Sequence, residues 1–158
     1  MTNEPDETMG RTELLDRIER SWVAFQATVN GLDDGQLGTT GPDGWTVKDH
    51  LVHVERWEAY MLAELEGRSG RPELEVPETE ERPETDDINE RLRASHSGLP
   101  AAEARTRLED THARMVALLG TLDEADLRRH LPRIAGNTHE HYDEHDGWIR
   151  TLTAAPAG

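Results

Sequence analysis

Apolar residues recur with a helical period in four long segments of the chain. In the first segment they fall at every third or fourth position from Leu14 to Val29. The second segment begins at a Thr-Val-Lys-Asp sequence, in which Thr46 and Asp49 have the spacing of a helix capping box, and it ends near Gly67. Each of these two segments predicts one amphipathic helix.

The third segment keeps helical register from Leu108 to Leu122, and the fourth begins between Pro132 and Asn137 and frays before Pro156. Val, Ile, Thr, Tyr and Phe are sparse relative to Leu, Ala, Glu and Arg, so strands are not expected. Four long amphipathic helices with one long connection predict an all-α fold, a four-helix bundle.

The connections between these helices are polar. Residues 31–44 predict a loop because they are rich in Gly and Asp. Residues 68–85 carry three prolines among many glutamates, so we expect an extended, exposed acidic crossover, followed by a short helix over residues 86–96. Residues 1–9 predict a flexible acidic leader, which leaves residues 10–154 as a single domain.

Composition and charge narrow the class of partner. The formal net charge is −16, from 33 acidic and 17 basic residues, so the surface is expected to repel both nucleic acid and anionic membranes. No run approaches the roughly 18 apolar residues of a membrane helix, and the acidic start is unlike a signal peptide, so we expect a cytoplasmic protein. The absence of cysteine excludes disulfides and thiolate ligands. A small-molecule substrate is the expected partner, and a homodimer is permitted without being required.

The histidines carry the strongest chemical signal. His141 and His145 lie four residues apart and therefore share one face of the predicted last helix. Trp148 and Leu152 continue that face, so we expect the pair to point into the protein, whereas His139 lies almost opposite and is expected to face solvent. Two neutral imidazoles held in this way can bind one divalent ion. The alternative is a metal-free polar pocket in which hydrogen bonds satisfy the ring nitrogens.

A third ligand has to come from another helix. The second helix offers His50, near the centre of its apolar face, and His53, at the flank beside Trp57 and Tyr60. His112 lies on the core face of the third helix and is a further candidate, or else a packed core histidine. Spacing alone does not choose among these histidines.

Two motifs are similar to those of a known family. Trp45-Thr-Val-Lys-Asp-His-Leu-Val-His53, followed by Trp57, resembles the second-helix signature of the DinB-like superfamily. Ile134-Ala-Gly-Asn-Thr-His-Glu-His-Tyr-Asp-Glu-His145 is similar to the last-helix motif of its ClbS/DfsB subgroup. The superfamily includes mycothiol-dependent maleylpyruvate isomerases and bacillithiol transferases, and the resemblance covers most of residues 10–153.

This resemblance implies an up-down-down-up four-helix bundle. It also implies a metal triad of one histidine from the second helix and two from the last, which are His53, His141 and His145 in this chain. Zinc is the first choice of ion for such ligands, with nickel, iron and manganese as alternatives. A low-molecular-weight thiol is a second cofactor that the resemblance implies.

Three hypotheses for the function follow. ClbS-like members act on reactive electrophiles, so the leading hypothesis is a detoxifying hydrolase that opens a small electrophile in self-protection. The alternatives are a thiol S-transferase or isomerase that uses mycothiol or bacillithiol, and a non-catalytic bundle that sequesters its ligand. Tyr60 is a candidate proton-transfer catalyst, with an ordinary amphipathic boundary residue as the alternative, and we expect His50, Trp57 and His112 to bind substrate. An anionic thiol would need bases near the metal, for which the candidates are Arg56, Arg91, Arg93 and Arg150.

Overall fold

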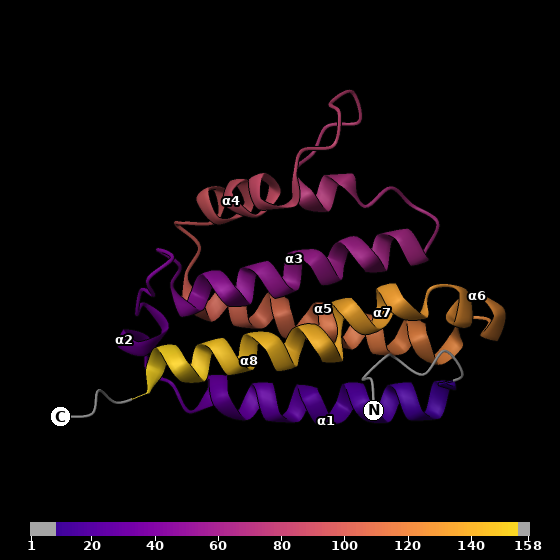
Figure 1. The fold of residues 1–158 in the computed structure, drawn as a ribbon, viewed down its shortest axis with the longest axis horizontal. Helices are drawn as coiled ribbons and strands as arrows, with labels where there is room; N and C mark the ends of the chain where they lie inside the picture. Colours follow the sequence, from indigo (N-terminus) through magenta and orange to yellow (C-terminus); the bar gives the residue numbers. More distant parts are fainter. Residues whose placement is uncertain (1–8, 155–158) are drawn as a thin grey trace.

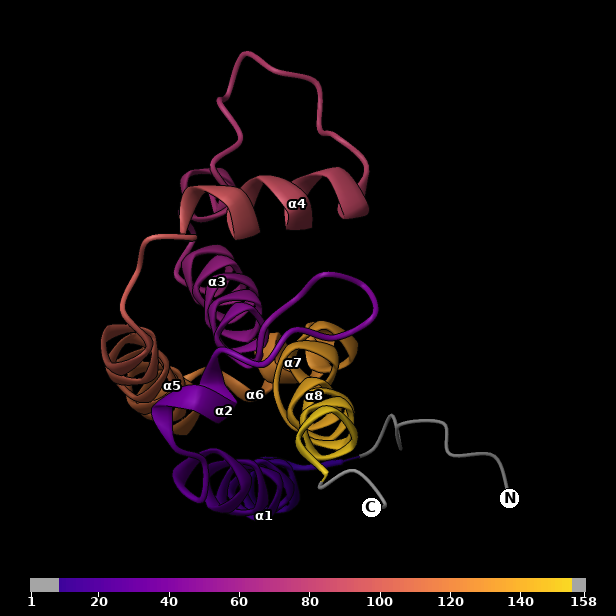
Figure 2. The same ribbon diagram turned by 90° about the vertical axis from the view of Figure 1, so that its left-hand side faces the viewer.

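Four long helices form a bundle in the computed structural model, which describes residues 9–154 (Figure 1). They are α1 (Arg11–Asn30), α3 (Val47–Leu65), α5 (Ala101–Thr121) and α8 (His139–Thr153). Helices α3 and α5 run in one direction and α1 and α8 in the other, which is the up-down-down-up order (Figure 1). Seen end-on, α1 lies beside α8 and α5, and α3 lies beside the same two helices (Figure 2). The predicted all-α bundle is confirmed.

Five shorter elements complete the described part of the chain. They are α2 (Asp34–Leu37), the 3-10 helix η1 (Arg71–Leu74), α4 (Thr85–Ser95), α6 (Glu124–Arg129) and α7 (Leu131–Asn137). Helix α2 lies within the predicted loop and has its own capping box, in which the Gln36 backbone N–H donates to Asp33 Oδ1 at 2.8 Å. Among residues 9–154, no helix combines the length and the apolar character that crossing a membrane requires.

The start of α3 is fixed by the capping box that the sequence predicts. The Thr46 backbone N–H donates to Asp49 Oδ2 at 2.9 Å, and the Asp49 backbone N–H donates to Thr46 Oγ1 at 3.1 Å. These bonds satisfy two backbone groups that the first turn of a helix leaves without partners. They also fix the helical register that puts His50 and His53 on the side of α3 facing α8.

The main hydrophobic core lies between the four long helices. Its largest fully buried side chains include Leu14, Phe25, Leu51, Leu108, Met115 and Tyr142. Met9 is also buried in this core, although the sequence assigned it to the leader. The rest of that predicted leader, residues 1–8, lies outside the described residues.

Part of the crossover from α3 to α5 packs on the outer face of α3, whereas residues 77–84 are mostly exposed and project from the bundle as a loop, as their composition predicts (Figure 2). Its apolar residues form a second, smaller core against Trp57 and Tyr60 of α3. The buried members of this core are Leu74, Val76, Ile88 and Leu92. A few apolar side chains among many glutamates are enough to dock the segment. Their removal from water is favourable, and most of the glutamates remain in solvent.

The predicted last helix is two helices, α7 and α8, separated at Thr138. The Thr138 hydroxyl donates to the Ile134 carbonyl at 2.6 Å, so it takes an acceptor that would otherwise belong to the helix backbone. His139 follows this break and is buried, so the expectation that it faces solvent was wrong. The physical reason is that α8 has α1 on one side and α3 on the other, and both faces are covered at this level.

Candidate metal centre

Three histidines converge between α3 and α8. His141 Nε2 lies 3.1 Å from His53 Nε2 and 3.1 Å from His145 Nε2. One ring nitrogen from each of the three side chains lies within 4.8 Å of the others. The pair on α8 shares one face because of its spacing, and His53 reaches it because α3 and α8 are neighbours in the bundle. The three predicted ligands are therefore brought together.

The donor set and its geometry fit a divalent ion. Nitrogen ligands at ~2.0–2.1 Å from zinc in a tetrahedral arrangement lie about 3.4 Å from one another, which is close to the 3.1 Å that separates His141 Nε2 from each of the other two. Without an ion, His141 Nε2 faces two other ring nitrogens and can share a proton with only one of them. An ion would accept all three lone pairs at once.

The protein environment keeps these imidazoles neutral and ready to bind a metal. Burial lowers the pKa of His53 to about 3, with smaller contributions from His141 and His50. Burial also lowers the pKa of His141 to about 4. The pKa of His145 falls well below 6.5, chiefly through burial and then through the neighbouring histidines. No proton therefore has to be displaced from an imidazolium at neutral pH before a ligand bond forms.

His50 contacts one of the three histidines, His145, on the side of its ring away from the other two. Its Nδ1 lies 2.9 Å from Nδ1 of His145, on the side of that ring opposite the Nε2 that faces His141. This hydrogen bond fixes the orientation of the His145 ring, which is the usual function of an outer-sphere partner. By contrast, Nδ1 of His53 and of His141 are buried and have no hydrogen-bond partner among residues 9–154. Between His50 and His53, which spacing alone could not separate, the structure puts His53 at the shared point.

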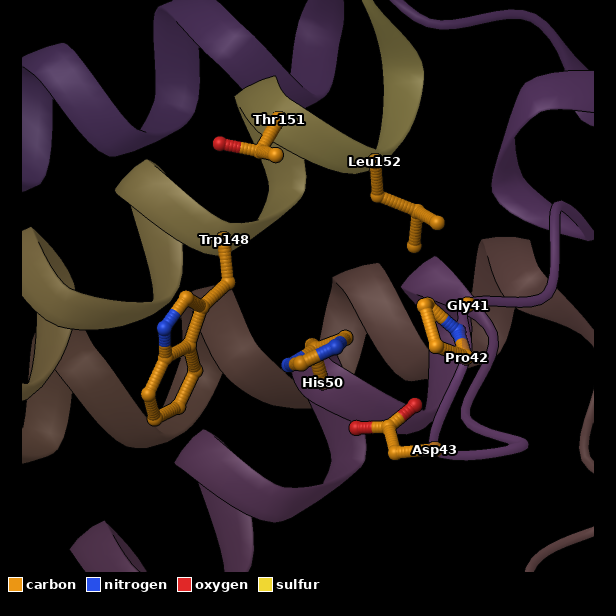
Figure 3. A pocket seen from close by; sticks show the side chains of 7 residues that line it. All are labelled: Gly41, Pro42, Asp43, His50, Trp148, Thr151 and Leu152. Atoms are coloured by element: carbon orange, nitrogen blue, oxygen red, sulfur yellow. The ribbon is translucent and has the colours of Figure 1, made fainter.

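The larger of two nearby cavities borders His50. It has a volume of about 510 Å³ and is lined by Gly41, Pro42, Asp43, His50, Trp148, Thr151 and Leu152. Figure 3 shows His50 between Trp148 on one side and Asp43 on the other. Trp148 is 52% exposed, so the face of α8 that carries the inward-pointing histidine pair is not covered along its whole length. Near the C-terminal end of α8 this face lies outside the core and forms part of the wall of the 510 Å³ cavity.

A smaller cavity borders the triad itself. It has a volume of about 270 Å³, and its wall contains His53 and His141 together with Trp57. The remaining lining residues are Arg82, Thr85, Asn89 and Asn137. Although the other cavity is larger, chemistry at the three Nε2 atoms is more accessible from this one, because two of the three histidines are in its wall.

The other predicted site residues divide between this cavity and the core. Trp57 lines the cavity, and its indole Nε1–H donates to Asn89 Oδ1 at 2.7 Å. Tyr60 packs against the smaller core and lines neither cavity, so the geometry does not support a proton-transfer function for it. His112 is also away from the triad, since its ring stacks on Trp22 with centroids 3.6 Å apart. The expectation that His112 contributes to the substrate site is not supported.

A buried polar cluster that the sequence analysis missed surrounds His112. The Tyr142 hydroxyl donates to Glu58 Oε2 at 2.8 Å, and His112 Nδ1 lies 2.8 Å from the same hydroxyl oxygen. Glu58 is fully buried, and burial raises its pKa from 4.5 to about 8. A signal was present in the sequence, because Glu58 lies four residues after Val54 and three before Met61, within the apolar stripe of α3.

The predicted basic cluster does not form at the triad. Arg56 binds Glu55 and Glu73, and Arg91 binds Glu80. Arg93 likewise binds Glu90, and Arg150 binds Asp146. None of these four arginines lines either cavity beside the histidines. The arginine that does so is Arg82, which the sequence analysis did not single out.

Comparison with known proteins identifies the family. A sequence model of the DinB superfamily matches residues 17–152. The chain belongs to the DinB superfamily. No curated protein sequence matches this DinB superfamily chain at a significant level.

Solved structures share the fold of this DinB superfamily member. DfsB, described as a sibling lethal factor precursor, is 18% identical, with a TM-score of 0.76 over 90% of this chain and 94% of its own. The colibactin self-resistance protein ClbS, in complex with a dsDNA, is 15% identical, with a TM-score of 0.76 over 94% and 98% of the two chains. An uncharacterised protein from Escherichia coli UTI89 is 15% identical, with a TM-score of 0.73 over 90% and 92%. The predicted likeness to ClbS and DfsB is confirmed at the level of the fold.

The expectation that nucleic acid is excluded as a partner was wrong. It is overturned by ClbS, a protein of this fold that is in complex with a dsDNA. The exclusion depended on the net charge of −16, which is a sum over the whole chain, whereas binding depends on the local charge of one surface. Such local variation is present here, since one cavity of about 250 Å³ has four arginines and three acidic residues in its wall. They are Arg56, Arg68, Arg107, Arg114, Glu55, Glu73 and Asp110.

Proposed function

We propose that this protein is a metal-dependent enzyme of self-protection that opens a small reactive electrophile at His53, His141 and His145. The observation that carries the proposal is the convergence of ring nitrogens from three neutral histidines beside an open cavity. Three protein ligands leave a coordination position free, which is typical of a catalytic and not a structural site. The fold shared with the self-resistance protein ClbS supports the biological context.

The residues of the site have separate functions in this proposal. His53, His141 and His145 would hold one divalent ion, with zinc as the first choice because all three ligands are imidazoles. When bound, such an ion supplies a Lewis acid that activates a water molecule or a thiol for attack. His50 keeps the His145 ring in position, and Trp57 forms an apolar wall of the cavity beside His53.

Turnover of simple electrophiles tests this function. The zinc-loaded protein is expected to convert an epoxide or an activated cyclopropane into a ring-opened product, which mass spectrometry detects as a gain of one water. His145→Ala should abolish this product because it removes one ligand. His130→Ala is the matched control, since His130 caps the C-terminal end of α6, is not one of the three converging histidines and lines neither cavity.

The same assay separates the alternative functions. If the product gains a thiol instead of water, and forms only when a low-molecular-weight thiol is added, the enzyme is a thiol S-transferase. If free electrophile disappears in a one-to-one ratio with protein and no product forms, the protein sequesters its ligand. Equal ring opening by the parent protein and by His145→Ala would contradict catalysis at this site.

His50 is expected to act as a positioning residue for the metal ligands. His50→Ala removes the hydrogen bond to His145 Nδ1 and should weaken zinc affinity by about 10–100-fold, the usual cost of losing an outer-sphere partner. Competition with a chelating dye measures this change, and the visible spectrum of the cobalt(II) form reports the coordination geometry. His50→Asn, which keeps a polar group near that nitrogen, should recover part of the affinity. A dissociation constant that does not change in His50→Ala would contradict the positioning function.

A further inference from the structure

The cavity of about 270 Å³ beside the triad has a cation in its wall. Arg82, from the segment that precedes α4, lines it together with His53 and His141. Arg82 forms no ion pair with any residue in the described range 9–154, whereas Arg91 and Arg93 of α4 are each paired with a glutamate. A guanidinium without an acidic partner at the mouth of a reaction site is available to a ligand.

Hydrogen-bond donors lie in the same wall. Asn89 accepts the indole N–H of Trp57 at its Oδ1, and because an indole can only donate, this contact fixes the orientation of the amide. The amide NH₂ of Asn89 is therefore left to donate to a ligand. The Thr85 hydroxyl also lines the cavity and makes no hydrogen bond within the described part of the chain.

The wall of this cavity contains no acidic side chain, although the chain as a whole carries a net charge of −16. Glu81 and Glu84 flank Arg82 in the sequence but do not line the cavity. In a protein with about two acidic residues for every basic one, a wall with one cation, several donors and no acid is a selective environment for an anion.

We infer that this cavity binds the carboxylate of a small molecule, with Arg82 as the recognition residue and the reactive end of the same molecule at the three histidines. The inference deepens the proposed function and rests on it for that reactive end. A guanidinium binds a carboxylate through two parallel N–H···O bonds, which fixes the orientation of the ligand as well as attracting it. The carboxylate can belong to a thiol cosubstrate or to the electrophile.

Two thiols that differ only in the carboxylate test the inference. The cobalt(II)-loaded protein is titrated with 3-mercaptopropionate and with 3-mercaptopropanol, and the sulfur-to-cobalt absorption band reports binding. The parent protein is expected to bind the carboxylate-bearing thiol about tenfold more tightly, the effect of one solvent-accessible charge-assisted contact. Arg82→Gln should bring the two dissociation constants together, and Arg82→Lys should keep part of the preference. Arg91→Gln is the matched control and should keep all of it.

The ratio of the two dissociation constants cancels any effect of a substitution on metal binding or folding, because such an effect changes the binding of the neutral thiol as well. Equal binding of both thiols by the parent, or an unchanged ratio in Arg82→Gln, would overturn the inference while leaving the proposed function intact. If cobalt does not bind, the proposed function fails. The carboxylate site is then tested by calorimetry of succinate with metal-free protein, and Arg82→Gln must lose that binding.

The source of the carboxylate is distinguished by two further results. A sulfur-to-cobalt band with an Arg82-dependent preference assigns the carboxylate to a thiol cosubstrate. Calorimetric binding of succinate that Arg82→Gln removes, in protein that gives no thiol band, assigns it to the electrophilic substrate. Either result supports an anion-binding cavity, and the absence of both contradicts it.

Discussion

Replacing His141 with alanine is expected to remove the bound metal from the purified protein. The untagged parent should carry about one divalent ion per chain, as expected for a site with three imidazole ligands. Loss of a direct ligand should cost more affinity than the ~10–100-fold that follows loss of an outer-sphere partner. Elemental analysis after dialysis gives the metal content, and chelator competition gives the dissociation constant for zinc.

A second readout separates loss of metal from loss of fold. Added zinc should raise the melting temperature of the parent protein, because a ligand that binds only the folded state stabilises it by mass action. The melting temperature of His141→Ala should not respond to zinc, while that of the control His130→Ala should respond like the parent. Equal and negligible metal in the parent and in His141→Ala would remove the ligation hypothesis and leave a metal-free polar pocket.

Glu58→Gln is expected to change the pH dependence of the stability of the metal-free protein between pH 6.5 and 8, because it removes a contribution that falls as pH rises. The pKa of Glu58 is raised from 4.5 to about 8, chiefly by burial, so in this range the folded chain holds a proton that the unfolded chain has released. Folding must then take up a proton at Glu58, so this carboxyl lowers the free energy of unfolding by about 1.4 kcal/mol for each pH unit that it stays protonated in the folded state. Urea denaturation at several pH values measures this slope.

The buried histidines contribute to the pH dependence with the opposite sign, and comparison of the parent with Glu58→Gln cancels their contribution because both proteins carry them. Burial lowers the pKa of His53 to about 3 and that of His141 to about 4, from a usual value of 6.5. The unfolded chain therefore binds more protons at these histidines, so their contribution to stability is lost progressively as pH falls through 6.5, in the parent and in the variant alike. Glu19→Gln, at an exposed position of α1, is the matched control and should keep the slope of the parent. An unchanged slope in Glu58→Gln would contradict a protonated buried carboxyl.

The helices could be predicted from the sequence because the forces that define them are local. The apolar period from Leu14 to Val29 matches α1, and the Thr46–Asp49 capping box marks the start of α3. The alignment of His141 with His145 is local in the same sense, since two side chains four residues apart on one helix must share a face. The choice of His53 over His50 came from resemblance to a family and not from spacing.

Several features of the site could not be predicted because they depend on contacts between distant segments. The hydrogen bond of His50 to His145 joins residues that lie 95 positions apart, and Arg82 reaches the cavity only because the crossover docks on α3. The burial of His139 and the exposure of Trp148 could not be predicted for the same reason. A helix face is polar or apolar by sequence, but whether it is covered depends on the neighbouring helices.

The sequence by itself determined the class of the fold, the long helices and the two histidine motifs, because periodicity, capping and spacing act within one or two turns of the chain. Only the tertiary structure decided which ring nitrogens meet, which arginine lies beside them and which carboxyl is buried. Those outcomes depend on how helices pack, and packing is set by the summed burial of many side chains from segments that are remote in the sequence.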